Sequence, residues 1–206
     1  MSVLFVDTTY DISLGILDDE CRWVEFRRHI GQRASILLQK EANQLFQDHG
    51  IVPHELKAVV TVAGPGFYTG LRLSEGLADV FEFFGIPHYS FLSYELPFLC
   101  GHKQGVWFTK AYRGEYFFHH WEGLNLKSVL VPAKDLVTYL ADLDEVFIHS
   151  ESALDEMSLT FIKKFVSTNE LIKNQPRKIF AEVLQNKSKR ESFYFRAPED
   201  EFRVST

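Results

Sequence analysis

The chain has 206 residues, 46% of them hydrophobic, and it carries 22 Lys and Arg against 28 Asp and Glu, a formal net charge of −6. This length is enough to bury a core in one large domain or two small ones. The aromatic content of 15% argues against intrinsic disorder. The net negative charge argues against a chain that binds nucleic acid by itself, because neutralising phosphates needs a cationic surface.

The first half of the chain is predicted to open with three strands and then to alternate helices and strands. Apolar or alternating runs indicate strands at residues 3–6, from 11 onward, and at 21–28, 57–63 and 87–91. Val24 and Phe26 are expected on the buried side of the third strand. Helical spacing predicts helices over 33–49, 69–84 and 94–100, and Gly50 and Gly85 are suited to end the first two.

Each of the two long helices is predicted to bury one stripe of its surface. The expected stripe of the first helix comprises Ala34, Leu38, Ala42, Leu45 and His49. The expected apolar face of the second comprises Leu73, Leu77, Val80, Phe81 and Phe84. Phe83 lies off this face, so it makes either a second contact within the chain or a contact with a partner helix. The small residues Gly76 and Ala78 favour the partner, because they permit close approach.

The second half of the chain is predicted to repeat the alternation of strands and helices. The polar, glycine-bounded stretch 101–105 is the expected boundary between two units, 1–102 and 103–206. Strands are expected at 106–111, 115–121, 129–131 and 145–149, helices at 132–141 and 176–187, and a last strand or extended tail at 192–196. This order predicts an α/β protein of two similar halves. The aromatic residues of 112–121 are expected in its core rather than stacked on bases.

Several classes of protein are excluded or disfavoured by the sequence. Cys21 and Cys100 lie far apart without metal-ligand spacing, which favours a reducing compartment. The amino-terminal segment lacks the basic stretch of a signal peptide, and no apolar run approaches the roughly 20 residues that span a bilayer. A cytoplasmic protein is therefore expected. None of the eight histidines pairs at i, i+4, and no metal site is predicted.

The most informative stretch is residues 64–72, Gly-Pro-Gly-Phe-Tyr-Thr-Gly-Leu-Arg, which follows a strand and opens a helix. Its glycines permit a tight turn, Thr69 suits a helix N-cap, and exposed amides at such a helix start can bind an anion. The alternative is a plain connection in which Gly70 and Gly76 let helices pack closely. The stretch is not a P-loop or a G-x-G-x-x-G motif, because it lacks the G-K-[ST] ending and the spacing.

Four stretches in order along the chain carry a family resemblance: VLFVDTT at 3–9, GPGFYTGLRLS at 64–74, KAYRGEYF at 110–117 and SFYFR at 192–196. They resemble the I-L-A-I-D-T-S/T, G-P-G-S-F-T-G-L-R-I-G, D-A-R-x-G-E-V-Y and P-x-Y-L-R motifs of the bacterial TsaB (YeaZ) family. That family supports the synthesis of threonylcarbamoyladenosine in tRNA. The resemblance extends over nearly the whole chain.

The chain also departs from the family pattern. Phe67 and Tyr68 stand where the glycine motif has Ser-Phe, and Ser74 stands where it has a second glycine. Lys110 and Tyr112 replace the Asp and Arg of the third motif, so the roles that the family gives to those two side chains are left open. The sequence is that of a divergent member.

The resemblance implies the actin/Hsp70/sugar-kinase (ASKHA) type of fold with two related lobes. It implies a non-catalytic subunit that pairs with a TsaD-type catalytic paralogue and is joined by a TsaE-type ATPase, or that forms a homodimer when alone. Contact with tRNA would be indirect, membranes would play no part, no cofactor would be intrinsic, and ATP–Mg would act only within the complex.

Two sets of residues become candidate site residues under this resemblance. The helices over 34–49 and 69–84 are expected to hold the partner through Leu38, Ala42, Leu45, Gly70, Leu73, Gly76, Leu77 and Phe83. Possible contacts to a nucleotide or anion are Asp7, Thr8, Gly64, Gly66, Thr69 and Arg72. For Asp7, a turn-capping role is favoured over holding Mg²⁺ through water.

One alternative function remains beside the scaffold, a small-molecule ATP-dependent kinase or ATPase of the same fold, which needs a complete phosphate loop and a catalytic base. The basic cluster 187–190 could touch RNA phosphates but is more simply a solvated charged segment.

Overall fold

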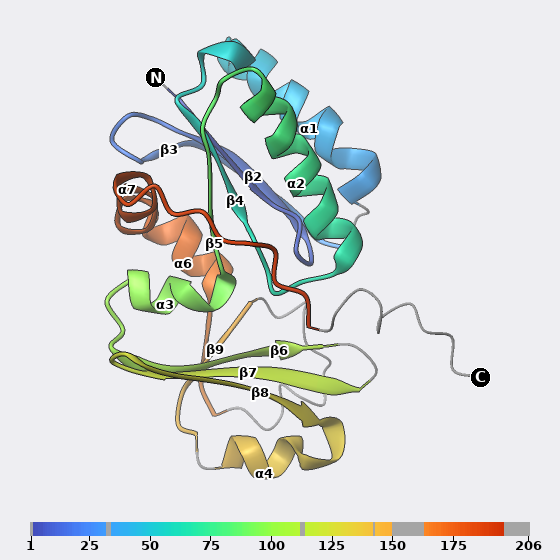
Figure 1. Cartoon of the computed structure of the whole chain (residues 1–206), viewed down its shortest axis with the longest axis vertical. Helices are drawn as coiled ribbons and strands as arrows, with labels where there is room; N and C mark the ends of the chain where they lie inside the picture. Colours follow the sequence, from blue (N-terminus) through green and yellow to red (C-terminus); the bar gives the residue numbers. More distant parts are fainter. Residues whose placement is uncertain (1, 32–33, 112–113, 142, 150–162, 196–206) are drawn as a thin grey trace, which may run out of the picture.

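Two five-stranded sheets with equivalent strand orders form the framework of the chain (Figure 1). The computed structural model describes residues 2–31, 34–111, 114–141, 143–149 and 163–195. The first sheet has the order β3-β2-β1-β4-β5, from β1 (Val3–Asp7), β2 (Ile12–Leu17), β3 (Trp23–His29), β4 (Ala58–Val62) and β5 (His88–Phe91). The second has the order β10-β9-β6-β7-β8, from β6 (Gln104–Lys110), β7 (Glu115–Glu122), β8 (Asn125–Pro132), β9 (Val146–Ile148) and β10 (Phe165–Ser167).

The two sheets repeat one topology. In each, three consecutive strands pair antiparallel, and the first of them also pairs parallel with the fourth, which pairs parallel with the fifth. An α/β unit of this kind, present twice in one chain, is the arrangement of a two-lobed ASKHA-type fold. The predicted fold class is therefore confirmed, whereas the division at 102/103 stays a prediction.

Among the described residues, the two sheets separate three apolar cores, each of which is covered by helices. α1 (Ala34–His49) and α2 (Tyr68–Phe83) lie side by side over one face of the first sheet, and α4 (Leu136–Ala141) covers the outer face of the second (Figure 1). The short α3 (Leu96–Leu99), α6 (Thr168–Asn174) and α7 (Pro176–Gln185) lie between the sheets. The core between the lobes joins Phe5 and Phe91 of the first sheet to Trp107 of the second, with Phe180 of α7 among them.

One predicted strand face is wrong because β3 contains an irregularity. Ile16 pairs with Glu25 and Leu17 pairs with Trp23, so Val24 has no partner across the ladder. An extra residue in one strand reverses which side chains face the core. Val24 is accordingly 48% exposed, while Trp23 and Phe26 pack against the core between the lobes.

The predicted orientation of α2 is also partly wrong. Phe67 is the N-cap and Thr69 lies inside the first turn, without the predicted capping role. Val80 and Phe84 are exposed, whereas Gly70, Leu71, Ser74, Ala78 and Phe81 form the buried face. Small residues on the side facing the sheet let the helix lie close to it, and the larger apolar residues are left outside.

The carboxyl-terminal half contains further differences. The strand predicted at 129–131 is the end of the longer β8, the helix predicted at 132–141 starts as a 3-10 turn (Ala133–Asp135), and β10 and α6 were not predicted. Residues 188–195, here called the strap, are the extended tail rather than a strand.

The aromatic residues Tyr116, Phe117, Phe118 and Trp121 are buried, as predicted. Tyr112 and Arg196 lie outside the described residues.

Among the helices that the structure describes, none is long and apolar enough to cross a membrane.

Candidate functional site

The junction between the lobes holds a buried polar cluster. Asp7 at the carboxyl end of β1 accepts hydrogen bonds from the backbone N–H and the hydroxyl of Thr9, at 2.9 and 2.6 Å. His149, which follows β9 in the other lobe, places Nε2 3.4 Å from Thr9 Oγ1 and 3.7 Å from Asp7 Oδ2. Its Nδ1 lies 3.5 Å from Ser93 Oγ. Two strand ends that are 142 positions apart in the sequence therefore meet in one cluster.

The cluster has the composition of a serine-hydrolase triad but lacks its access. A nucleophilic serine must reach a substrate carbonyl and lie within about 3.2 Å of its base. Ser93 is 0% exposed, His149 is 2% exposed, and their contact of 3.5 Å is long. The geometry suits a structural link between the lobes.

Burial controls the charge of this cluster. Desolvation lowers the pKa of His149, and the carboxylate of Asp7 opposes that shift without reversing it. The imidazole is thus held neutral at neutral pH. Tyr10 closes the cluster: its ring lies 4.8 Å from that of His149, its hydroxyl donates to Lys110 O, and burial raises its pKa.

The glycine motif serves close backbone packing. A Cβ at Gly66 would lie 2.6 Å from Thr9 Cβ, and one at Gly70 would collide with the carbonyl oxygen of Thr8. The hydroxyl of Thr8 donates to Gly70 O at 2.6 Å. Gly64 has a φ of +112°, and a Cβ added there would collide with the carbonyl oxygen of Phe193 in the strap. Thr8, Gly64 and Gly66, which were predicted to contact an anion, instead contact other residues of the same chain.

Arg72, another predicted anion contact, points to the strap. Its guanidinium lies over the rings of Tyr68 and Tyr194, at 5.4 and 5.8 Å, and pairs with Glu75 at 3.0 Å. Thr69 is exposed on the first turn of α2. Arg72 and Thr69 therefore do not belong to the polar cluster that contains Asp7.

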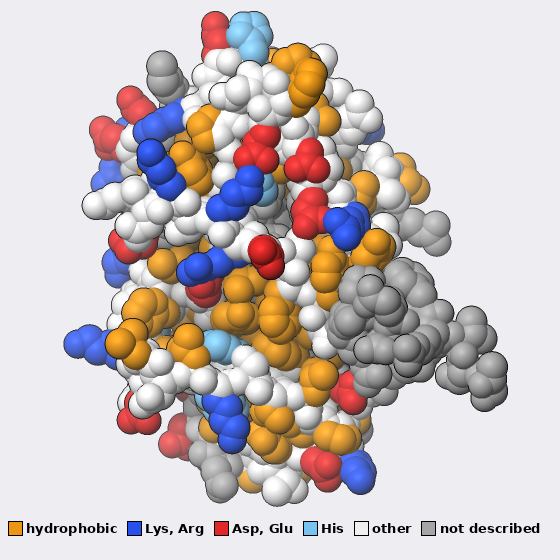
Figure 2. All heavy atoms as spheres, viewed as in Figure 1, with side chains coloured by type: hydrophobic (Ala, Val, Ile, Leu, Met, Phe, Trp, Pro, Cys, Tyr) orange, Lys and Arg blue, Asp and Glu red, His pale blue; other side chains and the backbone are white. Residues whose placement is uncertain are grey.

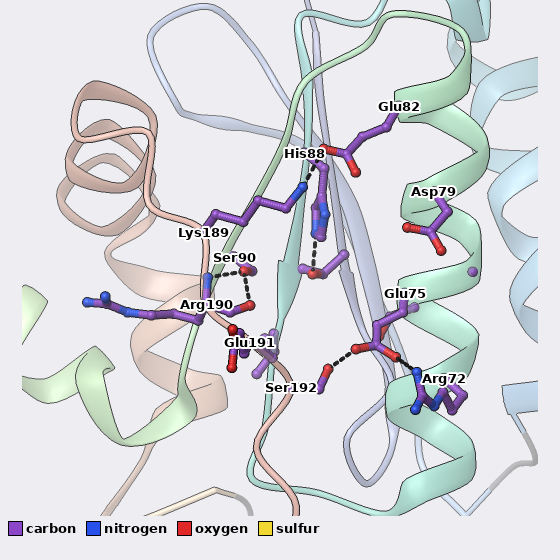
Figure 3. Close-up of a pocket in the computed structure, with 15 residues that line it drawn as sticks. Arg72, Glu75, Asp79, Glu82, His88, Ser90, Lys189, Arg190, Glu191 and Ser192 are labelled. Atoms are coloured by element: carbon purple, nitrogen blue, oxygen red, sulfur yellow. Dashed lines mark hydrogen bonds and ion pairs between the residues drawn. The ribbon is translucent and has the colours of Figure 1, made fainter.

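A polar groove of about 770 Å³ separates α2 from the strap (Figure 3). Ion pairs and hydrogen bonds cross it, from Lys189 to Glu82 at 2.5 Å and from Ser192 to Glu75. Arg190 pairs with Glu95 at 2.7 Å. The basic cluster 187–190 therefore forms part of the fold, a role that its charge pattern alone did not predict.

Half of the eight predicted partner-contact residues are buried inside the chain. Leu38, Ala42 and Leu45 are core residues of the first lobe, 5%, 4% and 0% exposed, and Gly70 is buried, so the prediction that they form a contact surface is corrected. Leu73 and Leu77 are partly buried and Gly76 is exposed. Phe83 is 85% exposed, and Ile36, Val80 and Phe84 are exposed on the same two helices. We call these four residues the outer helix face.

His149 is the candidate that sequence reasoning missed, and the position of the strap beside α2 was not predicted. The strand ending at His149 was predicted, but no local pattern shows that its histidine meets Asp7. The strap has few periodic residues, and its position depends on contacts with α2, with Ser90 of β5 and with Ala63, the residue after β4. Within the described residues, no group of three or more His, Cys, Asp and Glu side chains could hold a metal ion.

The two sheets of equivalent topology, which meet at the polar cluster, give the chain a two-lobed α/β fold of the ASKHA type. No family model matches the chain. A curated relative, the tRNA threonylcarbamoyladenosine biosynthesis protein TsaB of Bacillus subtilis (strain 168), is 28% identical over 79 residues. That segment is 38% of this chain and spans 34% of the relative's length.

Solved structures agree with this similarity. YeaZ from Pseudomonas aeruginosa superposes with a TM-score of 0.64 at 13% identity, covering 91% of this chain and 94% of its own. A structure described as an uncharacterized protein with similarity to peptidase YeaZ from Pseudomonas aeruginosa gives a TM-score of 0.63 at 13% identity, covering 93% and 99%. At this identity the structures show the fold. Together with the curated relative, they support the predicted TsaB/YeaZ family.

Proposed function

We propose that the chain is a non-catalytic scaffold subunit in bacterial tRNA threonylcarbamoyladenosine synthesis. It binds a TsaD-type catalytic paralogue, which transfers the threonylcarbamoyl group to the adenosine beside the anticodon. A TsaE-type ATPase joins the pair, and the chain acts in the cytoplasm. The similarity to TsaB supports the pathway, and the exposure of Phe83 on the outer helix face carries the scaffold role.

The outer helix face is suited to a partner because exposed apolar groups lie on two packed helices, three of them close together at the end of α2. Phe83 and Phe84 present their rings edge to face at 5.4 Å. Burying an exposed phenylalanine stabilises a complex by about 1.5–3 kcal/mol before association costs. The buried residues Leu38, Ala42 and Leu45 support this face from inside by fixing α1 on the sheet.

The polar cluster supports a non-catalytic role. The groups expected to face a nucleotide, Asp7 and Thr8, bond to Thr9 and Gly70. The isolated chain is therefore proposed to have no intrinsic cofactor, and ATP–Mg to act only within the complex. Contact with tRNA is assigned to the partner, because Lys189 and Arg190 already pair with Glu82 and Glu95.

Co-purification with the TsaD-type paralogue tests the interface. We expect Phe83→Asp to abolish co-elution, because a charge would be buried without a partner. Val137→Asp is the matched control: Val137 is 46% exposed on α4 of the other lobe, and this variant should bind normally. Equal binding by both variants would refute the outer helix face as the interface.

Reconstitution tests the role. Threonylcarbamoylation of tRNA by the paralogue and the ATPase should require this chain and should fall with Phe83→Asp. Isothermal titration of the isolated chain with ATP–Mg²⁺ addresses the kinase or ATPase alternative. Tight binding with turnover would favour that enzyme over the scaffold.

A further inference from the structure

The second sheet ends in a long strand with one free edge. β8 (Asn125–Pro132) pairs with β7 on one side, and among the described strands none pairs with its other side (Figure 1). Most of its residues are exposed. An unpaired edge of this length presents a row of backbone N–H and C=O groups that can pair with another extended chain.

An apolar groove adjoins this edge at the β7–β8 turn. It has a volume of about 550 Å³ and runs between the turn, α3 and α7. Leu124, Leu126 and Phe98 line it and are 94%, 67% and 52% exposed. Figure 2 shows hydrophobic side chains gathered across the middle of the face that carries α3. Exposed apolar surface of this kind commonly marks an interaction site.

The floor of the groove is fixed before anything binds. His119 donates to or accepts from the hydroxyl of Ser128 at 2.9 Å through Nδ1, and its ring stacks on Tyr94 at 4.0 Å. Trp121 donates from its indole N–H to the carbonyl of His102 at 2.9 Å. A floor already ordered lowers the entropy cost of binding.

The alternation of side chains along β8 specifies what fits. Leu126 lies across from Trp121 and lines the groove, while Lys127 lies across from His120 on the opposite face of the sheet. Lys127 has no carboxylate within ion-pair distance among the described residues. A strand added to this edge would therefore meet Leu126 and the groove on one face, and Lys127 beside the apolar side chains of Val129 and Val131 on the other.

We propose that the β8 edge and its groove bind an extended segment of a partner protein by strand addition. Backbone hydrogen bonds to β8 would provide affinity, and alternate side chains would provide specificity. Apolar side chains of the segment lie against Leu126 and the groove, and an intervening acidic side chain lies beside Lys127. This site is in the second lobe and does not depend on the outer helix face.

The test uses the full chain and fluorescence anisotropy with a labelled short peptide of alternating valine and glutamate. We expect saturable binding, and we expect an N-methylated copy of the peptide, which cannot donate backbone hydrogen bonds, to lose it. Lys127→Glu should weaken binding about fivefold and reverse the preference toward a valine–lysine peptide. Leu126→Ser should weaken binding to both peptides.

Val24→Ser, at an exposed apolar position on β3 of the first sheet, is the matched control and should bind the peptide as the unmodified chain does. The proposal is overturned if the N-methylated peptide binds equally well, or if Lys127→Glu and Leu126→Ser leave binding unchanged. It is also overturned if sedimentation shows self-association that Leu126→Ser abolishes while no peptide binds, because the occupant would then be a second copy of this chain.

Discussion

Gly70 and Gly76 lie in the same helix but face different surroundings. A Cβ at Gly70 would collide with the backbone oxygen of Thr8, whereas a Cβ at Gly76 would meet no atom within 4 Å. Replacing glycine by alanine inside a helix otherwise stabilises it by about 0.5–1 kcal/mol. We expect Gly70→Ala to lower the free energy of unfolding by about 1–3 kcal/mol, because overpacking outweighs that gain.

Gly76→Ala is the internal control and should raise the free energy of unfolding by about 0.5–1 kcal/mol. Urea denaturation followed by circular dichroism measures both variants. If the two substitutions had the same effect, the close approach of α2 to the loop after β1 would be wrong.

His149 is expected to make the free energy of unfolding depend on pH in the acidic range. Burial lowers its pKa below 6.5, the ordinary value for a histidine. As the pH falls below 6.5, the unfolded chain takes up a proton that the folded chain excludes, so stability declines until the folded-state pKa is reached. The contribution of one such histidine approaches about 1.4 kcal/mol per pH unit.

We expect His149→Gln to reduce the loss of stability between pH 6.5 and 5, because glutamine does not titrate. Urea unfolding at several pH values measures the slope. His54→Gln, at an exposed position in a 3-10 turn, is the control and should leave the slope unchanged. A slope unaffected by His149→Gln would contradict the buried, neutral state of this histidine.

At the scale of elements, the strap holds α2 against the first sheet from the groove side. Phe193 donates its N–H to Ala63 O, and its ring packs against Tyr94 and Phe117. Ser90 donates its N–H to the carbonyl of Ser188 at 2.8 Å, which fixes the other end. The exposed ion pairs along the strap add little on their own. Apolar packing of Phe193 is therefore expected to dominate its attachment.

We expect Phe193→Ala to destabilise the fold by about 2–4 kcal/mol and to increase tryptic cleavage after Lys189 and Arg190. Limited proteolysis with mass spectrometry measures the cleavage. Phe67→Ala, at a position 55% exposed, is the control and should leave cleavage unchanged. Equal cleavage of both variants would mean that the strap is held by other contacts.

The elements that sequence reasoning placed correctly are those with strong local patterns. The apolar run of β1 and the helical spacing of α1 are fixed by residues that also face the core. The side of β3 was missed because the irregularity at Val24 depends on pairing with β2. The cluster between the lobes was not predicted: Asp7 was singled out only as a strand-end residue, and its contact with His149 is set by the packing of the two lobes.

At the scale of the whole molecule, one apolar core joins the two lobes. The ring of Phe180 lies 5.3 Å from those of both Phe5 and Trp23, and Phe91 is 6.3 Å away. The same core includes Trp107 of the second sheet. A shared core of this kind couples the unfolding of both lobes, so we expect a single cooperative transition in urea.

Phe180→Ala should lower the free energy of unfolding by about 3–5 kcal/mol, because it removes a fully buried ring and leaves a cavity. Far-UV circular dichroism and tryptophan fluorescence should shift to the same lower midpoint, since the fluorescence combines Trp23 of the first sheet with Trp107 and Trp121 of the second. Phe84→Ala, at a position 68% exposed, should change stability by no more than about 0.5 kcal/mol. If Phe180→Ala shifted the signal of one lobe alone, the lobes would unfold independently, and the core that contains Phe180 would not couple them.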